Sequence, residues 1–217
     1  VATNLARWQD EGLVPDMAIE PGDETTRLFR ERGWTHWHHL YTPRNLLLMA
    51  TIKKHARTPD LALLHCGQAD WSSKKVRWDR ISLTALNAMT DQALDTNVDW
   101  LTRSGYVFCH SRNMTLRDRE VFARNVQIQS HPANEIECNA EIFITDPPYA
   151  DAVNYHEITE YFIAWMRKSP PKPFDEWVWD SRRALAIKGS GEDFRRGMVA
   201  AYRAMAEHMP DNGLQCG

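Results

Sequence analysis

The chain has 217 residues, of which 43% are hydrophobic and 25% charged, and its 26 basic and 29 acidic side chains give a net charge of −3. This composition is typical of a globular protein and excludes a disordered or fibrous chain. No apolar run approaches the length of a bilayer span, so we expect no membrane association. A negative net charge also means that any DNA contact must depend on local basic patches.

The four cysteines are far apart in sequence and show no paired spacing typical of a metal site; they are Cys66, Cys109, Cys138 and Cys216. Residues 1–20 lack the charged-then-apolar pattern of a secretory signal. Isolated thiols suit a reducing compartment, so we expect a cytoplasmic protein without a disulfide framework.

The first 35 residues are polar and contain several helix-breaking residues, Pro15, Pro21, Gly22 and Gly33. They predict an irregular lead-in with one short helix. Residues 36–135 are predicted to form a mainly helical region, either an insertion or a part that recognises the target.

Two helices are predicted within this region. Thr42 is a suitable N-cap and Pro43 suits the first helical position, after which apolar residues continue to about Ala56. The apolar run at residues 61–66 suits either a helix or a strand, because periodicity does not separate the two at this length, and we favour a helix.

Three histidines lie close together at His36, His38 and His39. Imidazole is a common zinc ligand, but His36 and His38 share a face only on an extended strand. No cysteine or second histidine pair lies nearby to complete four ligands. We therefore predict packing and hydrogen bonding at the start of the helix, and no metal.

Basic and aromatic residues alternate in the segment 71–80. Lys74, Lys75 and Arg77 lie between Trp71 and Trp78, a composition suited to binding phosphates and stacking on an unpaired base. We assign these three cations as candidate substrate-binding residues. The alternative is a solvated loop that its tryptophans anchor to the core, which the lack of a second basic cluster nearby favours.

A short strand is predicted to end at Asp146. Residues 141–145 are rich in β-branched and aromatic side chains, and Pro147 and Pro148 then stop the strand because neither donates a ladder hydrogen bond. The prolines also stiffen the loop. The Asp146 carboxylate and the flat ring of Tyr149 are suited to grip an amino group on a planar base. The alternative is an ordinary turn whose tyrosine packs in the core.

The Asp-Pro-Pro-Tyr sequence at residues 146–149 resembles the motif of amino-group DNA methyltransferases. The run 146–155 and the aromatic helix at 156–167 resemble the large adenine-specific enzymes of bacterial anti-phage gene clusters, and segments 37–46 and 194–213 agree. The resemblance covers most of the chain from about residue 20. It implies an α/β fold, a partial class I (Rossmann-like) methyltransferase with a mainly helical insertion, in which residues 136–217 form part of the catalytic domain.

The resemblance also implies the chemistry, a methyl transfer from S-adenosylmethionine to the amino nitrogen of a flipped-out adenine in DNA. Asp146, Pro147, Pro148 and Tyr149 would be the catalytic residues. Tyr149 would stack on the base, while the Asp146 side chain and the Pro147 carbonyl accept the two amino hydrogens. Two more residues are candidate contacts to the target nucleotide, Asn154 and Tyr155. The implied partners are DNA and subunits of a restriction-modification or anti-phage defence system.

The glycine-rich turn that such enzymes use for their cofactor is not visible in the sequence. The only Gly-x-Gly, at Gly189 and Gly191, opens what we predict to be a peripheral helix. The chain begins at Val1 and stops at Gly217, so we expect an internal fragment of a longer enzyme. Two alternatives stay open: a different acceptor, namely cytosine, RNA or a protein amide, and a non-catalytic nucleic-acid-binding or scaffold piece of a defence system.

Two further helices are predicted after the loop. The first has a core face, expected to lie against the sheet, made of Ile158, Tyr161, Phe162 and Trp165. The second has a capping-box signature that begins at Ser190 and an apolar stripe made of Phe194, Met198, Tyr202, Met205 and Met209.

Overall fold

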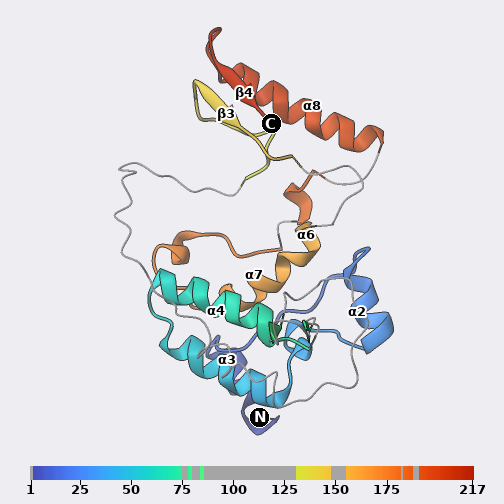
Figure 1. Ribbon diagram of the computed structural model, residues 1–217, viewed down its shortest axis with the longest axis vertical. Helices are drawn as coiled ribbons and strands as arrows, with labels where there is room; N and C mark the ends of the chain where they lie inside the picture. Colours follow the sequence, from blue (N-terminus) through green and yellow to red (C-terminus); the bar gives the residue numbers. More distant parts are fainter. Residues whose placement is uncertain are drawn as a thin grey trace. The chain divides into compact units, whose positions relative to one another are not determined.

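The computed structural model describes residues 2–74, 78–79, 84–85, 131–147, 155–181, 183–187 and 191–217 (Figure 1). The chain divides into two compact units, a helical unit (residues 1–126 and 158–180) and a strand-containing unit (residues 127–157 and 181–217). The fold class is mixed, with many helices and a small parallel sheet. The sequence predicts this combination of helices and sheet. None of the described helices combines the length and the apolar character needed to cross a bilayer.

The helical unit contains five α-helices among its described residues: α1 (Leu5–Asp10), α2 (Thr25–Arg32), α3 (Pro43–His55), α4 (Pro59–Ser72) and α7 (Glu160–Met166). It also holds the short 3-10 helices η1 (Ala2–Asn4), η2 (Trp37–Leu40) and η3 (Phe174–Glu176), and the two-residue antiparallel strands β1 (Trp78–Asp79) and β2 (Thr84–Ala85). Two α-helices therefore form within the first 35 residues, where the sequence predicts one. Their side chains Trp8 and Leu28 are buried in the core of the unit.

The helices α3 and α4 begin with the same local device. The hydroxyl of Thr42 accepts a hydrogen bond from the amide of Asn45, and the hydroxyl of Thr58 accepts one from the amide of Leu61. In each case proline takes the first helical position, where its missing N–H costs nothing. The predicted start of α3 at Pro43 is confirmed, and the run at residues 61–66 is helical.

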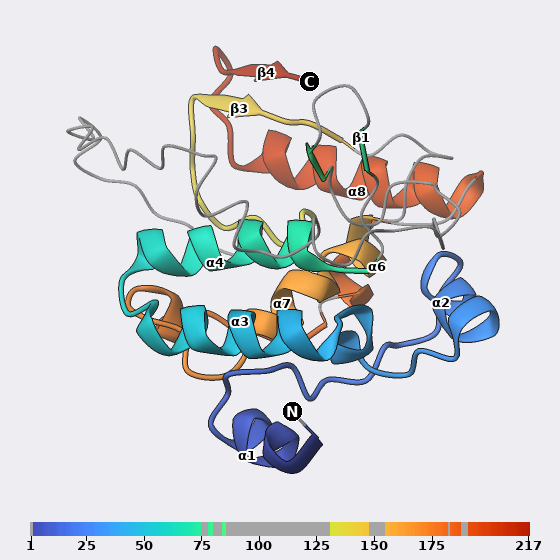
Figure 2. The same ribbon diagram turned by 60° about the horizontal axis from the view of Figure 1, so that its bottom comes forward.

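A buried polar cluster joins α4 and α7 to Tyr41, which lies two residues before α3. The indole of Trp165 donates a 2.8 Å hydrogen bond to the Tyr41 hydroxyl, which donates to the carbonyl of Ala69 at 3.0 Å and contacts the hydroxyl of Tyr161. All four residues are buried in one core with Trp37. Figure 2 shows α3, α4 and α7 gathered around this core.

The core face of α7 is confirmed, since Tyr161 and Trp165 are almost fully buried. Its partners in the structure are helical: the Trp165 ring lies 5.0 Å from the ring of His65 on α4 and 5.2 Å from that of Tyr41. The sequence predicted the sheet as the partner. A periodic apolar face shows that a helix is covered but does not identify the element that covers it.

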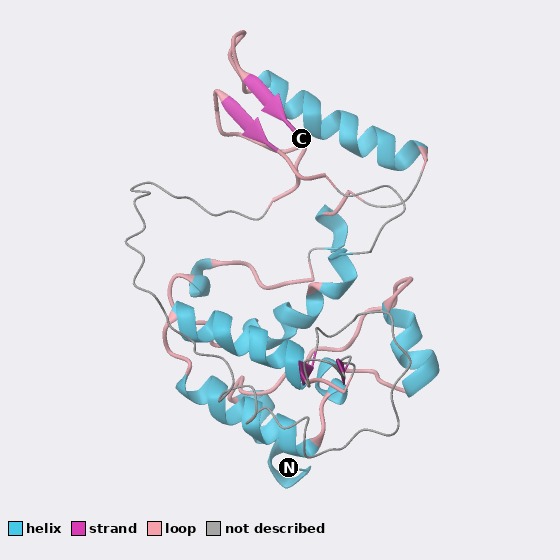
Figure 3. Cartoon of the chain, in the orientation of Figure 1, coloured by secondary structure: helices cyan, strands magenta, loops and turns pink. Residues whose placement is uncertain are grey.

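The strand-containing unit is built on a parallel pair, β3 (Ile142–Ile144) and β4 (Leu214–Cys216), in which Ile142 pairs with Leu214. Figure 3 shows the two arrows pointing the same way, with the long helix α8 (Glu192–Glu207) next to them. Parallel strands need a long connection, usually helical, and α8 lies in that connection. The unit also contains η4 (Arg183–Leu185), and the short helix α6 (Tyr155–Ile158) starts within it.

The two faces of the β3–β4 pair differ. The amide of Gln215 lies 3.7 Å from the sulfur of Met205, so the face that carries Gln215 is turned towards α8. The opposite face is apolar and open: Ile142, Ile144 and Leu214 are 58%, 84% and 55% exposed. Alternate residues of a strand point to opposite faces, which explains this division.

The helix α8 packs by the side that the sequence predicts, because Met205 is buried together with Ala201 and Ala204. Its N-cap is Gly191, with a φ of 68° and no side-chain cap. The predicted cap, Ser190, lies outside the described residues.

Candidate functional site at the end of strand β3

The predicted catalytic loop begins at the carboxyl end of β3. The strand ends at Ile144, and the amide of Thr145 still donates a 2.8 Å hydrogen bond to the carbonyl of Cys216 on β4. Asp146 follows as an exposed residue and Pro147 as a half-buried one. The predicted strand before Asp146 is therefore confirmed. The Asp146 carboxylate is exposed and open to a ligand.

Because β3 and β4 are parallel, their carboxyl ends lie at the same edge of the sheet, and Asp146 and Gly217 leave the strands at that edge. A side-chain carbon at Gly217 would lie 2.7 Å from the Thr145 hydroxyl oxygen and 3.8 Å from that of Tyr202. The absence of a side chain at Gly217 thus keeps the two backbones close beside the candidate site. In open α/β sheets, ligands bind at this end of the strands.

Sequence reasoning missed Thr145 and Tyr202 as neighbours of this edge. The hydroxyl of Thr145 donates to the Cys216 carbonyl at 3.2 Å, in addition to the amide bond. A threonine directly before the motif was the only local signal. Tyr202 lies there because of the position of α8. Sequence periodicity assigns Tyr202 to a face of that helix but does not show that the face lies near a strand end.

Several predicted site residues lie outside the described part of the chain: Pro148, Tyr149, Asn154, Lys75 and Arg77. Tyr155 begins α6, but its side chain is not described. Their assigned roles stay predictions.

Of the three candidate cations in the predicted basic segment, Lys74 is the one whose side chain is described. Its amine lies 4.8 Å from the ring centroid of Trp34, and its amide donates to the Leu40 carbonyl. The side chain is half-buried, and this burial lowers the pKa of the amine. Lys74 belongs to the helical unit and Asp146 to the strand-containing unit.

The three histidines cluster at η2. The rings of His38 and His39 lie 4.4 Å apart, and the Nδ1 atom of His38 lies 3.4 Å from the side-chain amide of Gln9. Burial, followed by the neighbouring histidines, lowers the pKa of His38 to about 4. The predicted packing and hydrogen bonding are confirmed. Within the described ranges, no three His, Cys, Asp or Glu side chains are placed to hold a metal ion.

No protein-family model, curated protein or solved structure matches the chain.

Proposed function

We propose that the chain forms part of an S-adenosylmethionine-dependent methyltransferase that modifies the exocyclic amino group of adenine in DNA. The observation that carries the proposal is the exposed Asp146 carboxylate at the carboxyl end of β3, next to a parallel strand. The Asp-Pro-Pro-Tyr sequence suggests the chemical role of this position, because it resembles the motif of amino-group DNA methyltransferases.

The base is recognised by hydrogen-bond acceptors in the stiff, proline-containing loop after β3. An exocyclic amino group carries two hydrogens, and the side chain of Asp146 and the carbonyl of Pro147 accept one each. The ring of Tyr149 stacks on the base. These contacts position the nitrogen and polarise it without a covalent bond to the protein.

The target nucleotide has to leave the duplex, because a stacked and paired base does not present its amino group to the edge of a sheet. Flipping costs a few kcal/mol of lost stacking and pairing. Stacking on Tyr149 offsets part of this cost, on the order of 1–3 kcal/mol per base.

The described residues include two proposed acceptors for the base, Asp146 and Pro147, but no turn suited to the cofactor. The described segments that follow β3 and β4, residues 145–147 and Gly217, contain no glycine-rich turn. Gly191 has a positive φ but opens α8 instead of following a strand. No described residue is therefore assigned to S-adenosylmethionine.

This same observation favours a second candidate, a non-catalytic nucleic-acid-binding or scaffold piece of a defence system. The experiment that separates the candidates offers the complete protein that contains this chain S-adenosylmethionine with a labelled methyl group and, in separate reactions, DNA, RNA and a protein acceptor. The proposal expects label in DNA. Label only in RNA or protein would identify that molecule as the acceptor in place of DNA. DNA binding without any transfer would support the second candidate.

A further inference from the structure

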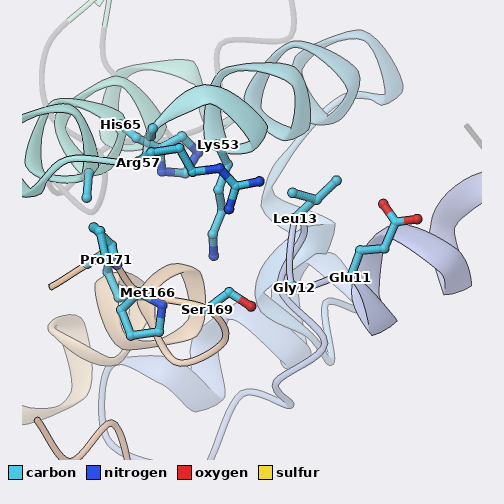
Figure 4. Close-up of a pocket in the computed structure, with 12 residues that line it drawn as sticks. Glu11, Gly12, Leu13, Lys53, Arg57, His65, Met166, Ser169 and Pro171 are labelled. Carbon is cyan, nitrogen blue, oxygen red and sulfur yellow. The ribbon is translucent and has the colours of Figure 1, made fainter. Parts of the chain in front are cut away.

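A pocket of about 60 Å³ lies within the helical unit (Figure 4). It is bounded by the end of α3, the first turns of α4, the segment after α7 and the turn after α1. Apolar groups of Leu13, Ala62, Met166 and Pro171 line much of it. In Figure 4 the side chains of Lys53 and Arg57 extend into this space.

The amine of Lys53 is short of partners. It donates a hydrogen bond to the carbonyl of Trp165, near the end of α7. An ammonium has three N–H donors, so this carbonyl satisfies one. Among the described residues no carboxylate forms an ion pair with Lys53. Burial consequently lowers the pKa of the amine to about 8.

Arg57 adds a second positive charge at the mouth of the same pocket. It follows α3 and is exposed, and the described carboxylates form no ion pair with it either. The only acidic residue of the lining, Glu11, already lies 3.8 Å from Arg7. His65 is neutral at pH 7, because burial lowers its pKa to about 3. The lining therefore carries excess positive charge.

A cation that is removed from water without a counter-charge costs free energy, and buried charges in proteins are accordingly paired. The helix-end carbonyl beside Lys53 supplies only part of a negative charge. A ligand oxyanion would accept hydrogen bonds from the remaining N–H groups of Lys53 and from the guanidinium of Arg57. The planar guanidinium suits carboxylates and phosphates.

We propose that this pocket binds the oxyanion head of a small carboxylate or phosphate compound, held between the Lys53 ammonium and the Arg57 guanidinium, with its apolar part against Met166 and Pro171. One water molecule needs about 10–15 Å³ of such space, so a pocket of about 60 Å³ has room for a head group and a few further atoms. The proposal is independent of the methyltransferase proposal.

The test titrates the protein with acetate and, separately, with inorganic phosphate, and follows the NMR signal of the Lys53 ε-methylene. Two variants are compared. Arg57→Gln removes one ligand at an exposed position where the fold is not at risk, and Lys54→Gln is the matched control, an exposed lysine of α3 outside the pocket. We expect Arg57→Gln to weaken binding roughly tenfold, as for the loss of a charge-assisted pair, and Lys54→Gln to leave it unchanged.

The stronger of the two anions identifies the head group as a carboxylate or a phosphate. If neither anion binds, or if the two variants bind equally well, the proposal is overturned.

A pH series with acetate tests the amine itself. The titratable groups around it are Glu11, Asp16, Arg57, His65, Cys66 and Lys168. Burial raises the pKa of the Cys66 thiol to about 11, so Lys53 is the group in the pocket that loses its charge between pH 7 and 9.5. We expect acetate to bind several-fold more weakly at pH 9.5 than at pH 7. Equal affinity at both values excludes the Lys53 ammonium as a ligand.

Discussion

The amide of Thr145 donates a 2.8 Å hydrogen bond to the carbonyl of Cys216, one residue before the proposed base-binding carboxylate. The Thr145 hydroxyl donates to the same carbonyl at 3.2 Å. These bonds extend the parallel ladder past the last residue of β3 and fix the backbone that carries Asp146. The backbone next to Asp146 is therefore held in place before any substrate arrives, as preorganisation of an acceptor requires.

In the complete enzyme of which we propose this chain forms part, replacing Asp146 by asparagine is expected to leave the protein folded and to remove most of its methyl transfer. The side chain is exposed, so the free energy of unfolding should change by less than about 0.5 kcal/mol. The affinity for S-adenosylmethionine should stay the same, because the lost acceptor serves the target amine. Transfer should fall on the order of 100-fold. Asp211→Asn, another exposed aspartate of the same unit, is the control and should retain full activity.

Tyr149 is expected to act through its ring. Tyr149→Ala should weaken transfer by the loss of one stacking contact, about 1–3 kcal/mol of transition-state stabilisation, and Tyr149→Phe should be mild. The measurement is kcat/KM for methylation of a DNA substrate. If the phenylalanine variant were as impaired as the alanine variant, the hydroxyl and not the ring would be the working group.

The hydroxyl of Tyr41 is expected to stabilise the helical unit. Tyr41→Phe leaves the buried N–H of Trp165 without its acceptor and the Ala69 carbonyl with one donor fewer. The free energy of unfolding should fall by about 1–3 kcal/mol. Every tryptophan of the chain belongs to the helical unit, so urea unfolding followed by tryptophan fluorescence reports on that unit alone.

The control for this substitution is Tyr161→Phe in parallel. Its hydroxyl shares the Ala69 carbonyl at 2.5 Å but accepts nothing from the indole of Trp165. We expect a smaller loss than in Tyr41→Phe. An equal or larger loss would show that the indole bond is not the main contribution.

Local signals in the sequence predicted local structure well. The threonine and proline at residues 42–43 act on the adjacent backbone, and α3 begins where they predict. The prolines after Asp146 act in the same local way, and β3 ends before them. Both outcomes follow from the fixed φ and the missing N–H of proline, which need no tertiary partner.

Features that depend on distant segments were not predicted. The apolar face of α7 was recognised, but its helical partners come from residues more than 90 positions earlier. The pocket at Lys53 lies where the ends of α1, α3 and α7 come together. Nothing near Lys53 in the sequence indicates that these three helix ends are neighbours. The open apolar face at Ile144 likewise depends on what covers the sheet, which strand alternation alone does not give.

Acid should destabilise the helical unit through His65. Its pKa is about 3 in the fold against an ordinary value of 6.5, mainly because of burial, so the unfolded chain takes up the proton first as the pH falls. The stabilisation is fully present above about pH 6.5 and is lost progressively towards pH 3. Between pH 6.5 and 5 the loss should be about 2 kcal/mol.

The variant His65→Gln tests this dependence, because glutamine can still donate to the carbonyl of Met49 that the ring contacts at 3.2 Å. Urea unfolding at pH 7.5 and pH 5 should show a smaller loss in this variant than in the original protein. His55→Gln, at an exposed position at the end of α3, should keep the original loss. Identical losses in all three proteins would contradict the role of His65.

The most direct test of the central claim is the identity of the methylated nucleoside. The complete enzyme that contains this chain is incubated with duplex DNA and S-adenosylmethionine that carries a labelled methyl group, the DNA is digested, and the nucleosides are separated. We predict label in N6-methyl-2′-deoxyadenosine, and its loss in Asp146→Asn with full retention in Asp211→Asn. Label that survives undiminished in Asp146→Asn would contradict the claim that this carboxylate holds the target amine.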